Sequence, residues 1–230
     1  MEERGGYGQF CPVSMASEVV CSRWTTLVVR ELLCGSTRFN DLRRGLPKMS
    51  PALLSKRLKE LQRAGVITIS RKSNGIAEYR LSRAGEELRP VIEGLGIWAQ
   101  RWMESRLTLE NLDPSLLMWD MRRSLNVKLM PSRRCTIQFL YSDLPETQKR
   151  WWLVVDGGVV DVCSFDPGHE LDLVVKCPLR SMTAIWMGLA TIEDESASGE
   201  FQVEGDQKLA RTMQQWLGLS AFAHEERRVA

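Results

Sequence analysis

The sequence predicts two domains, a mainly α winged helix-turn-helix followed by an α+β domain. Between Arg38 and Gly85 the chain reads as a short helix, a turn, a basic amphipathic helix and a two-stranded β-ribbon. Beyond residue 112, strand-like segments alternate with apolar helical ones, as in an α+β layer. Residues 1–106 carry 18 Lys and Arg against 11 Asp and Glu, whereas residues 107–230 carry 13 against 18. A basic half therefore precedes an acidic half, which is typical of a nucleic-acid module joined to another domain. We place the domains at 1–106 and 112–220, with a linker near 106–114.

Composition and cysteine use exclude several classes of protein. No apolar run reaches the ~18–20 residues of a transmembrane helix, and the N-terminus has no apolar signal-peptide core. We therefore expect a cytoplasmic protein that does not enter a membrane. Six cysteines without a C-x-x-C pair, and only two histidines, His169 and His224, give no ligand set for zinc and no catalytic triad. We expect no metal, no cofactor and no enzymatic activity.

The second helix of the motif is predicted to begin at Ser50-Pro51, an N-cap serine followed by a proline in the first helical position. Leucines at 54, 58 and 61 give it one core-facing side, and Gly65 ends it. The opposite face is small at its start and cationic beyond, so it can enter the major groove of duplex DNA. For an isolated helix a solvated face is the simpler interpretation, but the flanking elements favour DNA. The DNA contacts predicted from this helix and the turn before it are Arg38, Ser50, Pro51, Ala52, Ser55, Lys56 and Lys59.

The ribbon is predicted from two β-rich segments, 66–70 and 77–81, on either side of Asn74-Gly75. This dipeptide favours a type I′ turn, in which both central residues have positive φ. Arg71, Lys72 and Asn74 place polar and positive groups at the tip, where a wing contacts phosphates or the minor groove. The alternative is an edge hairpin whose cations only prevent aggregation.

A long helix is predicted from Ser82. Its apolar face is too wide for a lone surface helix, so it needs cover from this subunit or from a second copy. The residues of this face are Leu88, Val91, Ile92, Leu95, Trp98, Ala99 and Trp102. A homodimer also suits the DNA interpretation, because two recognition helices about one turn of duplex apart read a pseudo-palindromic operator.

Residues ~10–105 resemble the HxlR type of bacterial transcription regulator, a relative of the MarR group. The matching motifs lie in the expected order along the chain. They are Cys11-Pro12-Val13, Trp24-Thr25, Leu32-Leu33, Gly35-x-x-Arg38-Phe39-x-x-Leu42, Ser50-x-x-x-Leu54-Ser55-x-Arg57-Leu58-Lys59-Glu60-Leu61, Gly65-Val66-Ile67, Glu78-Tyr79-x-Leu81-Ser82, Gly85 and Trp98. The resemblance implies a homodimeric DNA-binding regulator that uses this second helix and the wing.

Two features of the resemblance concern particular positions. The family usually carries prolines before the Glu-Tyr pair of the wing, whereas this chain has Ser73 to Ala77, so its wing geometry is expected to differ. In some members the cysteine before the proline senses thiol-reactive compounds, and Cys11 occupies that position. An unreactive thiol is the alternative. Cys21 and Cys34 lie on apolar helix faces and are predicted to be small core residues.

The acidic half is predicted to contain several antiparallel strands and three helices. The strands are Cys135–Tyr141, Trp151–Asp156, Val159–Phe165, Leu171–Lys176 and Gly199–Val203. The helices are Ser115–Leu125, Leu179–Met187 and a final helix from Gly205-Asp206.

This half resembles the sterol-carrier-protein type of lipid-binding fold. The matching pieces are Asp172-x-Val174, the Pro178–Gly188 helix, Ala197 and Gly199-x-Phe201-x-Val203-x-Gly205-Asp206. The resemblance implies an apolar tunnel between sheet and helices, and hence a small apolar effector. The residues predicted to line it are Trp119, Phe139, Ile185, Trp186, Leu189 and Phe201. The alternative is that these side chains simply fill a core.

The function expected from the sequence is a dimeric, DNA-binding transcriptional regulator, a repressor rather than an activator, with the acidic domain as its effector module. A carrier of hydrophobic ligands whose winged helix binds protein is the alternative, and the basic first half argues against it. An enzyme is a third class, but no paired carboxylates, phosphate-binding loop or metal cluster stands out.

Overall fold

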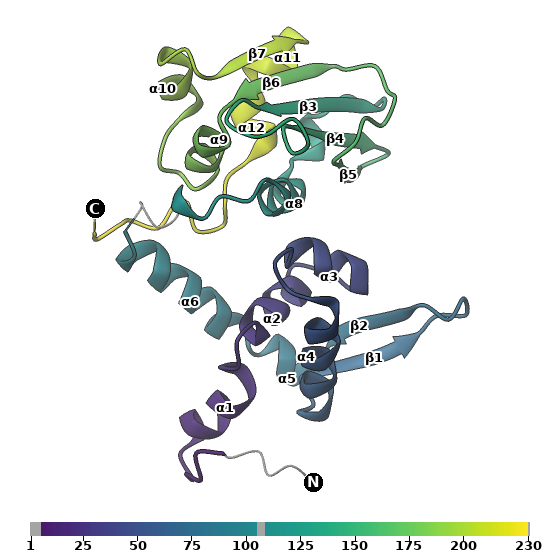
Figure 1. Ribbon diagram of the computed structural model, residues 1–230, viewed down its shortest axis with the longest axis vertical. Coiled ribbons are helices and arrows are strands. Elements are labelled where there is room, and N and C mark those ends of the chain that lie inside the picture. Colours follow the sequence, from purple (N-terminus) through teal and green to yellow (C-terminus); the bar gives the residue numbers. More distant parts are fainter. Residues whose placement is uncertain (1–5, 105–108, 230) are drawn as a thin grey trace. The chain divides into compact units, whose positions relative to one another are not determined.

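The computed structural model describes residues 6–104 and 109–229, which divide into two compact units, Met1–Leu95 and Gly96–Ala230 (Figure 1). Part of the predicted linker, residues 105–108, lies outside the described residues. The predicted domain limits, 1–106 and 112–220, stay a prediction, and the two units are described separately below.

The first unit is a helical winged helix-turn-helix. Its elements are α1 (Pro12–Val20), α2 (Thr25–Leu33), α3 (Phe39–Gly45), α4 (Pro51–Arg63), β1 (Ile67–Arg71), β2 (Ala77–Leu81) and α5 (Arg83–Glu86). One apolar core joins α2, α3, α4 and the start of β1. Its buried side chains are Val28, Val29, Leu32, Leu42, Leu46, Met49, Leu54, Leu58, Leu61, Val66 and Ile67.

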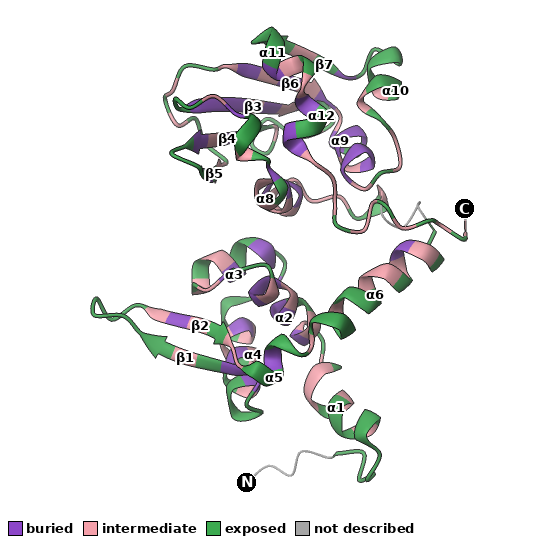
Figure 2. Ribbon diagram, turned by 180° about the vertical axis from the view of Figure 1, so that it is seen from behind, coloured by how far each residue is buried: buried purple, intermediate pink, exposed green. Residues whose placement is uncertain are grey.

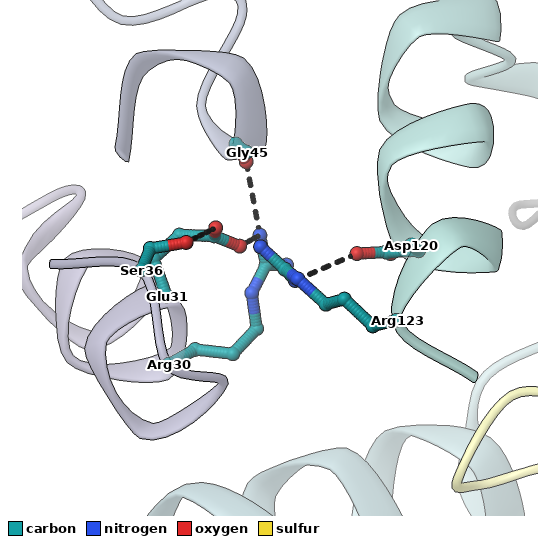
Figure 3. A network of polar contacts seen from close by, with 6 residues as sticks. All are labelled: Arg30, Glu31, Ser36, Gly45, Asp120 and Arg123. Carbon is teal, nitrogen blue, oxygen red and sulfur yellow. Dashed lines mark hydrogen bonds and ion pairs between the residues drawn. The ribbon is translucent and has the colours of Figure 1, made fainter. Parts of the chain in front are cut away.

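A buried carboxylate joins α2 to the end of α3 (Figure 3). Glu31 has no exposed surface, and its carboxylate accepts hydrogen bonds from Arg30 Nη2 at 2.9 Å and from the Ser36 hydroxyl at 3.3 Å. The same Arg30 nitrogen also donates to the Gly45 carbonyl at 3.0 Å. Because a buried charge is costly unless it is paired, this cluster fixes the packing of α3 on α2.

The turn of the β1–β2 hairpin differs from the predicted type I′. Positive φ occurs at Gly75 (79°), and the only described non-glycine residue with positive φ is Trp24, so Asn74 does not adopt it. Gly75 N–H donates to the Lys72 carbonyl at 2.8 Å, and Lys72 N–H donates to the Ile76 carbonyl at 3.0 Å. This is a three-residue loop with a left-handed glycine at its end. Asn74 Oδ1 accepts from Ile76 N–H at 3.1 Å and holds the turn in that form.

The long helix predicted from Ser82 is two helices, α5 and α6 (Arg89–Trp102). Pro90 lies in the first turn of α6 and has no N–H to continue the preceding helix. Leu88 and Ile92 pack against the core of the first unit. The division between the units falls within α6, after Leu95.

The second unit contains a five-stranded sheet in the order β5-β4-β3-β6-β7 (Figure 1). The strands are β3 (Cys135–Tyr141), β4 (Arg150–Asp156), β5 (Val159–Cys163), β6 (Leu173–Cys177) and β7 (Gln202–Gly205). The sheet is mixed rather than antiparallel as predicted, because β6 pairs in parallel with β3, from Ile137↔Leu173 to Tyr141↔Cys177. The chain after β5 crosses to the other side of β3, so a non-local pairing replaces the expected meander.

The helices of the second unit share one apolar core with the sheet. They are α8 (Pro114–Ser124), η1 (Val127–Leu129), α9 (Leu179–Trp186), α10 (Ile192–Ala197), α11 (Gln207–Arg211) and α12 (Met213–Leu217). The predicted final helix is broken into α11 and α12 at Thr212, whose hydroxyl donates to the Lys208 carbonyl at 2.9 Å. No described helix has the length and apolar character needed to cross a membrane.

Residues 218–229 form a segment without helix or strand, which we call the C-terminal strap. It begins at Gly218, which has a φ of 72° and ends α12. The strap then packs on the second half of α6, where Arg228 N–H donates to the Arg101 carbonyl at 2.8 Å.

Candidate nucleic-acid interface

Helix α4 presents a core face and a solvent face, as its sequence pattern predicts. Ser50 caps its N-terminus by accepting a hydrogen bond from Leu53 N–H at 3.3 Å. The leucines at 54, 58 and 61 are at most 1% exposed. The predicted DNA contacts on the other face are exposed, except for Ser55, which is half-buried; they are Ser50, Pro51, Ala52, Ser55, Lys56 and Lys59.

The charge of this face is positive. Neither Lys56 nor Lys59 forms an ion pair within the described part of the chain, so both ammonium groups face solvent. Glu60, the one carboxylate in α4, forms an ion pair with Arg57. Arg57 Nε donates to the Arg23 carbonyl at 3.1 Å, which ties α4 to the turn before α2. The Glu60 charge is thus compensated within the unit, and the lysines carry the net charge of the face.

The wing is fixed at its base and exposed at its tip (Figure 2). Ser82 N–H donates to the Val66 carbonyl at 2.9 Å, and the Ser82 hydroxyl donates to the Gly65 carbonyl at 2.6 Å. Tyr79 N–H donates to the Thr37 carbonyl at 2.8 Å, which ties β2 to the segment before α3. Arg38 follows Thr37 and is exposed at the N-terminus of α3.

Glu78 neutralises part of the wing. Lys72 Nζ lies 3.1 Å from its Oε1, and Arg80 Nη2 lies 3.1 Å from its Oε2. Hydrogen bonds from Lys72 and Arg80 lower the pKa of Glu78, so it is ionised at neutral pH. Arg71 Nη1 donates to the Gly75 carbonyl at 3.2 Å. The predicted wing residues Arg71, Lys72 and Asn74 are therefore exposed, but each also makes a contact within the hairpin.

Sequence reasoning missed the Glu78 contact and the Arg57 clamp. The signal for the first was the hairpin register, in which Ser70 pairs with Glu78 and Arg71 with Ala77. That register places Lys72, one residue beyond the last pair, within reach of the Glu78 side chain. The Arg57 clamp joins residues 34 positions apart and has no local sequence signal.

Helix α6 exposes most of its apolar face (Figure 2). The exposed fractions are 50% for Val91, 51% for Leu95, 59% for Trp98 and 48% for Trp102. Exposed apolar area of this kind is typical of interaction surfaces. It is the surface for which the sequence predicts cover from this subunit or from a second copy.

The structure places the predicted pocket residues in two settings. Phe139, Ile185, Trp186 and Phe201 are buried in the core of the second unit. Trp119 is also buried, with the Arg122 guanidinium 4.0 Å from its ring centre. The sixth residue, Leu189, lines a hollow at the surface. The tunnel therefore stays a prediction.

This hollow has a volume of about 670 Å³ and is open to solvent. The loop after α9, the start of α10, helices α11 and α12 and the strap form its walls. Its apolar wall residues are Leu189, Ala190, Ile192, Ala210, Met213, Leu219 and Ala223, and charged residues at its rim are Glu193, Asp194 and Arg211.

The cysteines divide by exposure. Cys11 is exposed at the N-cap of α1, directly before Pro12. Cys21 and Cys34 are exposed as well, so their assignment to the core is wrong. Each follows the last residue of a helix, where the chain turns away from the core. Cys135 and Cys177 are buried in the sheet. Nowhere in residues 6–104 and 109–229 do three or more His, Cys, Asp or Glu side chains gather to hold a metal ion.

Comparison with known proteins places the first unit in a family. The sequence model of the HxlR-like helix-turn-helix family matches residues 19–107. YvaP of Bacillus subtilis, an uncharacterised HTH-type transcriptional regulator, is 34% identical over 99 residues, which make up 42% of this chain and 92% of YvaP. The chain belongs to the HxlR-like helix-turn-helix family. The match ends at residue 107, so most of the second unit lies outside the HxlR-like region.

Further relatives of the HxlR-like region come from the same organism. YdeP, another uncharacterised HTH-type transcriptional regulator of B. subtilis, is 30% identical over 41% of this chain and 75% of its own length. The HTH-type transcriptional regulator YodB is 27% identical over 41% of this chain and 87% of YodB. The solved reduced form of YodB aligns with 42% of this chain and 98% of that chain, with a TM-score of 0.37.

Proposed function

We propose that the protein is a cytoplasmic, homodimeric transcriptional regulator that binds a pseudo-palindromic operator and acts as a repressor. The observation that carries this proposal is the solvent face of α4. Small residues at its start allow close approach to base edges, and two unpaired lysines follow where phosphates would lie. The HTH-type transcriptional regulators among the relatives agree with it.

The proposed dimer uses the exposed apolar face of α6. Two copies that cover Val91, Leu95, Trp98 and Trp102 would remove a continuous apolar stripe from water. A symmetric pair also places two α4 helices on one operator, which is why the operator is proposed to be pseudo-palindromic.

The proposal includes control by a small apolar effector that binds the second unit. It also includes a relationship between the second unit and sterol-carrier-like domains. Support comes from the way the motif segments meet. Asp206 N–H donates to the Asp172 carbonyl at 2.8 Å, and a Cβ on Gly205 would lie 2.3 Å from that oxygen. The motif glycine is therefore required for the contact between β6 and β7. Oxidation of the exposed Cys11 is a second proposed input.

The test measures, by fluorescence anisotropy, how tightly the purified full chain binds a duplex that spans its own promoter. Lys56→Ala and Lys59→Ala should each weaken binding and reduce the slope of log affinity against log salt by about 0.9 per lost phosphate contact. Lys128→Ala, an exposed lysine of the second unit, is the matched control and should leave both unchanged. If both α4 variants bind with wild-type affinity and salt dependence, α4 does not contact the DNA as proposed. Absence of DNA binding by the wild-type chain would favour the carrier alternative.

A further inference from the structure

The second half of α6 is held by the C-terminal strap. Arg101 Nη2 and Nε lie 2.6 and 2.9 Å from Glu225 Oε2. Arg227 Nη1 donates to the Met103 carbonyl at 3.1 Å, and the Arg228 guanidinium stacks on the Trp102 ring at 5.6 Å from its centre. Three strap residues thus engage the last turn of α6, more than a hundred residues earlier in the sequence.

An apolar contact accompanies these polar ones. The Phe222 ring lies directly on Gly96, where a Cβ would come within 2.3 Å of the ring. The neighbouring strap residue, Ala223, packs on Gly188 at the start of the loop after α9, where a Cβ would lie 3.0 Å from the Ala223 Cβ. Successive strap residues therefore touch α6 and the wall of the hollow.

The strap thus contacts α6 and also forms part of the wall of the hollow. Leu219 and Ala223 line the hollow, and Phe222 between them contacts α6. Ser220 N–H donates to the Trp186 carbonyl at 2.9 Å, which fixes the start of the strap to the end of α9. Any molecule that adds contacts to the strap side of the hollow would stabilise the arrangement in which the strap holds α6.

The chemistry of the hollow selects its ligand. Its volume, about 670 Å³, lies within the ~300–1,000 Å³ typical of small-molecule sites. The walls are mainly aliphatic, with Thr191 and Gln214 as their uncharged polar members. None of the described buried polar side-chain atoms that lack a hydrogen-bond partner belongs to a lining residue. The Asp194 carboxylate accepts from the Thr191 hydroxyl at 2.6 Å and from its N–H at 3.2 Å. The rim carries two carboxylates, Glu193 and Asp194, and one guanidinium, Arg211, so it does not attract an anion, and the mainly aliphatic walls favour an uncharged molecule.

We propose that the hollow binds an uncharged apolar small molecule, and that this molecule strengthens the hold of the C-terminal strap on α6. An effect of this molecule on DNA binding rests on the proposed function. It would pass through α6, whose first half lies in the first unit, where Leu88 and Ile92 pack on the core that carries α4. By reciprocity, a change that releases the strap must weaken ligand binding, and ligand and strap release must have opposite effects on DNA affinity.

The binding test uses N-phenyl-1-naphthylamine, an uncharged apolar fluorophore, with the full chain. One molecule should bind per chain. Ile192→Glu places a charge in the aliphatic wall and should weaken binding about tenfold or more. Ala190→Trp, which fills the hollow, should do the same. Val159→Glu changes an exposed apolar residue of β5 outside the hollow and should bind within about twofold of wild type.

Hydrogen exchange of the same samples tests the coupling without DNA. The fluorophore should slow amide exchange in residues 96–104 and 219–229 of the wild type and of Val159→Glu. Phe222→Ala should speed exchange in residues 96–104 and weaken fluorophore binding several-fold. The proposal is overturned if the fluorophore does not bind, if both hollow variants bind it normally, or if exchange in residues 96–104 does not respond. A chain that passes these tests but binds no DNA would contradict only the proposed function.

Discussion

Gly45 lies against the carboxylate of Glu31 so closely that a Cβ at this position would be 1.9 Å from Oε2 (Figure 3). The end of α3 is therefore shaped around a buried charge. The neighbouring Arg30 and Ser36 side chains already donate to that carboxylate, so it has little freedom to move away from an added methyl group.

Gly45→Ala is accordingly expected to destabilise the protein by about 1–3 kcal/mol, the usual cost of overpacking a filled site. Urea unfolding followed by circular dichroism measures this. Gly94→Ala is the matched control, because its Cβ would meet nothing within 4 Å and alanine is the better helix former at this α6 position. Equal free energies of unfolding for the two variants would show that the Glu31 carboxylate can move away from the added methyl group.

Ser55→Ala tests whether the half-buried serine of α4 reads a base. If it does, the variant should lose preference among operator sequences while its affinity for unrelated duplex changes little. Competition binding with operator duplexes that carry single base-pair changes measures the preference. A uniform loss on all sequences would instead assign the serine hydroxyl a role in phosphate binding or in helix stability.

The wing turn makes different demands on Asn74 and Gly75. Gly75→Ala should destabilise the hairpin by about 1–2 kcal/mol, since its φ of 79° is unfavourable for an L-residue with a Cβ. Asn74→Ala removes only the hydrogen bond to Ile76 N–H and should cost about 1 kcal/mol or less. Exchange of the Lys72 amide proton, which bonds to the Ile76 carbonyl, reports hairpin opening. Similar losses of stability for the two substitutions would instead support a type I′ turn, in which Asn74 also has positive φ.

Thiol labelling should separate the cysteines into two classes. Burial raises the pKa of Cys135 to about 12 and also raises that of Cys177. Because a raised pKa favours the neutral thiol, about one Cys135 side chain in ten thousand is a thiolate at pH 8, and reactivity should increase only as the pH approaches 12. N-ethylmaleimide at pH 8 should therefore label Cys11, Cys21 and Cys34 in the folded protein and leave the two buried cysteines unmodified.

Mass spectrometry of the labelled peptides gives this result directly. Unfolding in urea supplies the control, since all six thiols should then react. Labelling of Cys135 in the native state at the rate of Cys21 would show that the sheet opens readily at the start of β3.

Local signals in the sequence predicted much of the fold. Ser50-Pro51 defined the start of α4, and the leucine spacing defined its buried face. The segment Cys135–Tyr141 forms β3 with the predicted limits, and from Ile137 onward its residues alternate between buried and half-buried. These elements are determined by capping and periodicity, which act over a few residues.

The features that the sequence did not predict depend on contacts between distant residues. Parallel pairing of β6 with β3 joins segments about 36 residues apart, and the pattern within each strand is the same whichever neighbour it has. Exposure of Cys21 and Cys34 depends on how the chain turns at two helix ends. In the candidate site, the solvent face of α4 followed from periodicity, whereas the pairing of Lys72 with Glu78 required the register of a turn whose type was mispredicted.

The strap also has a consequence for the order of events during synthesis. Chains fold from the N-terminus as they are made. The helix-turn-helix can therefore be complete while residues 218–229 have not yet been translated. Until then the end of α6 lacks Phe222 and Glu225, so each newly made chain passes through a period in which the first unit is formed but α6 is not held at its end. A stop codon that removes residues 218–229 would make that transient form permanent.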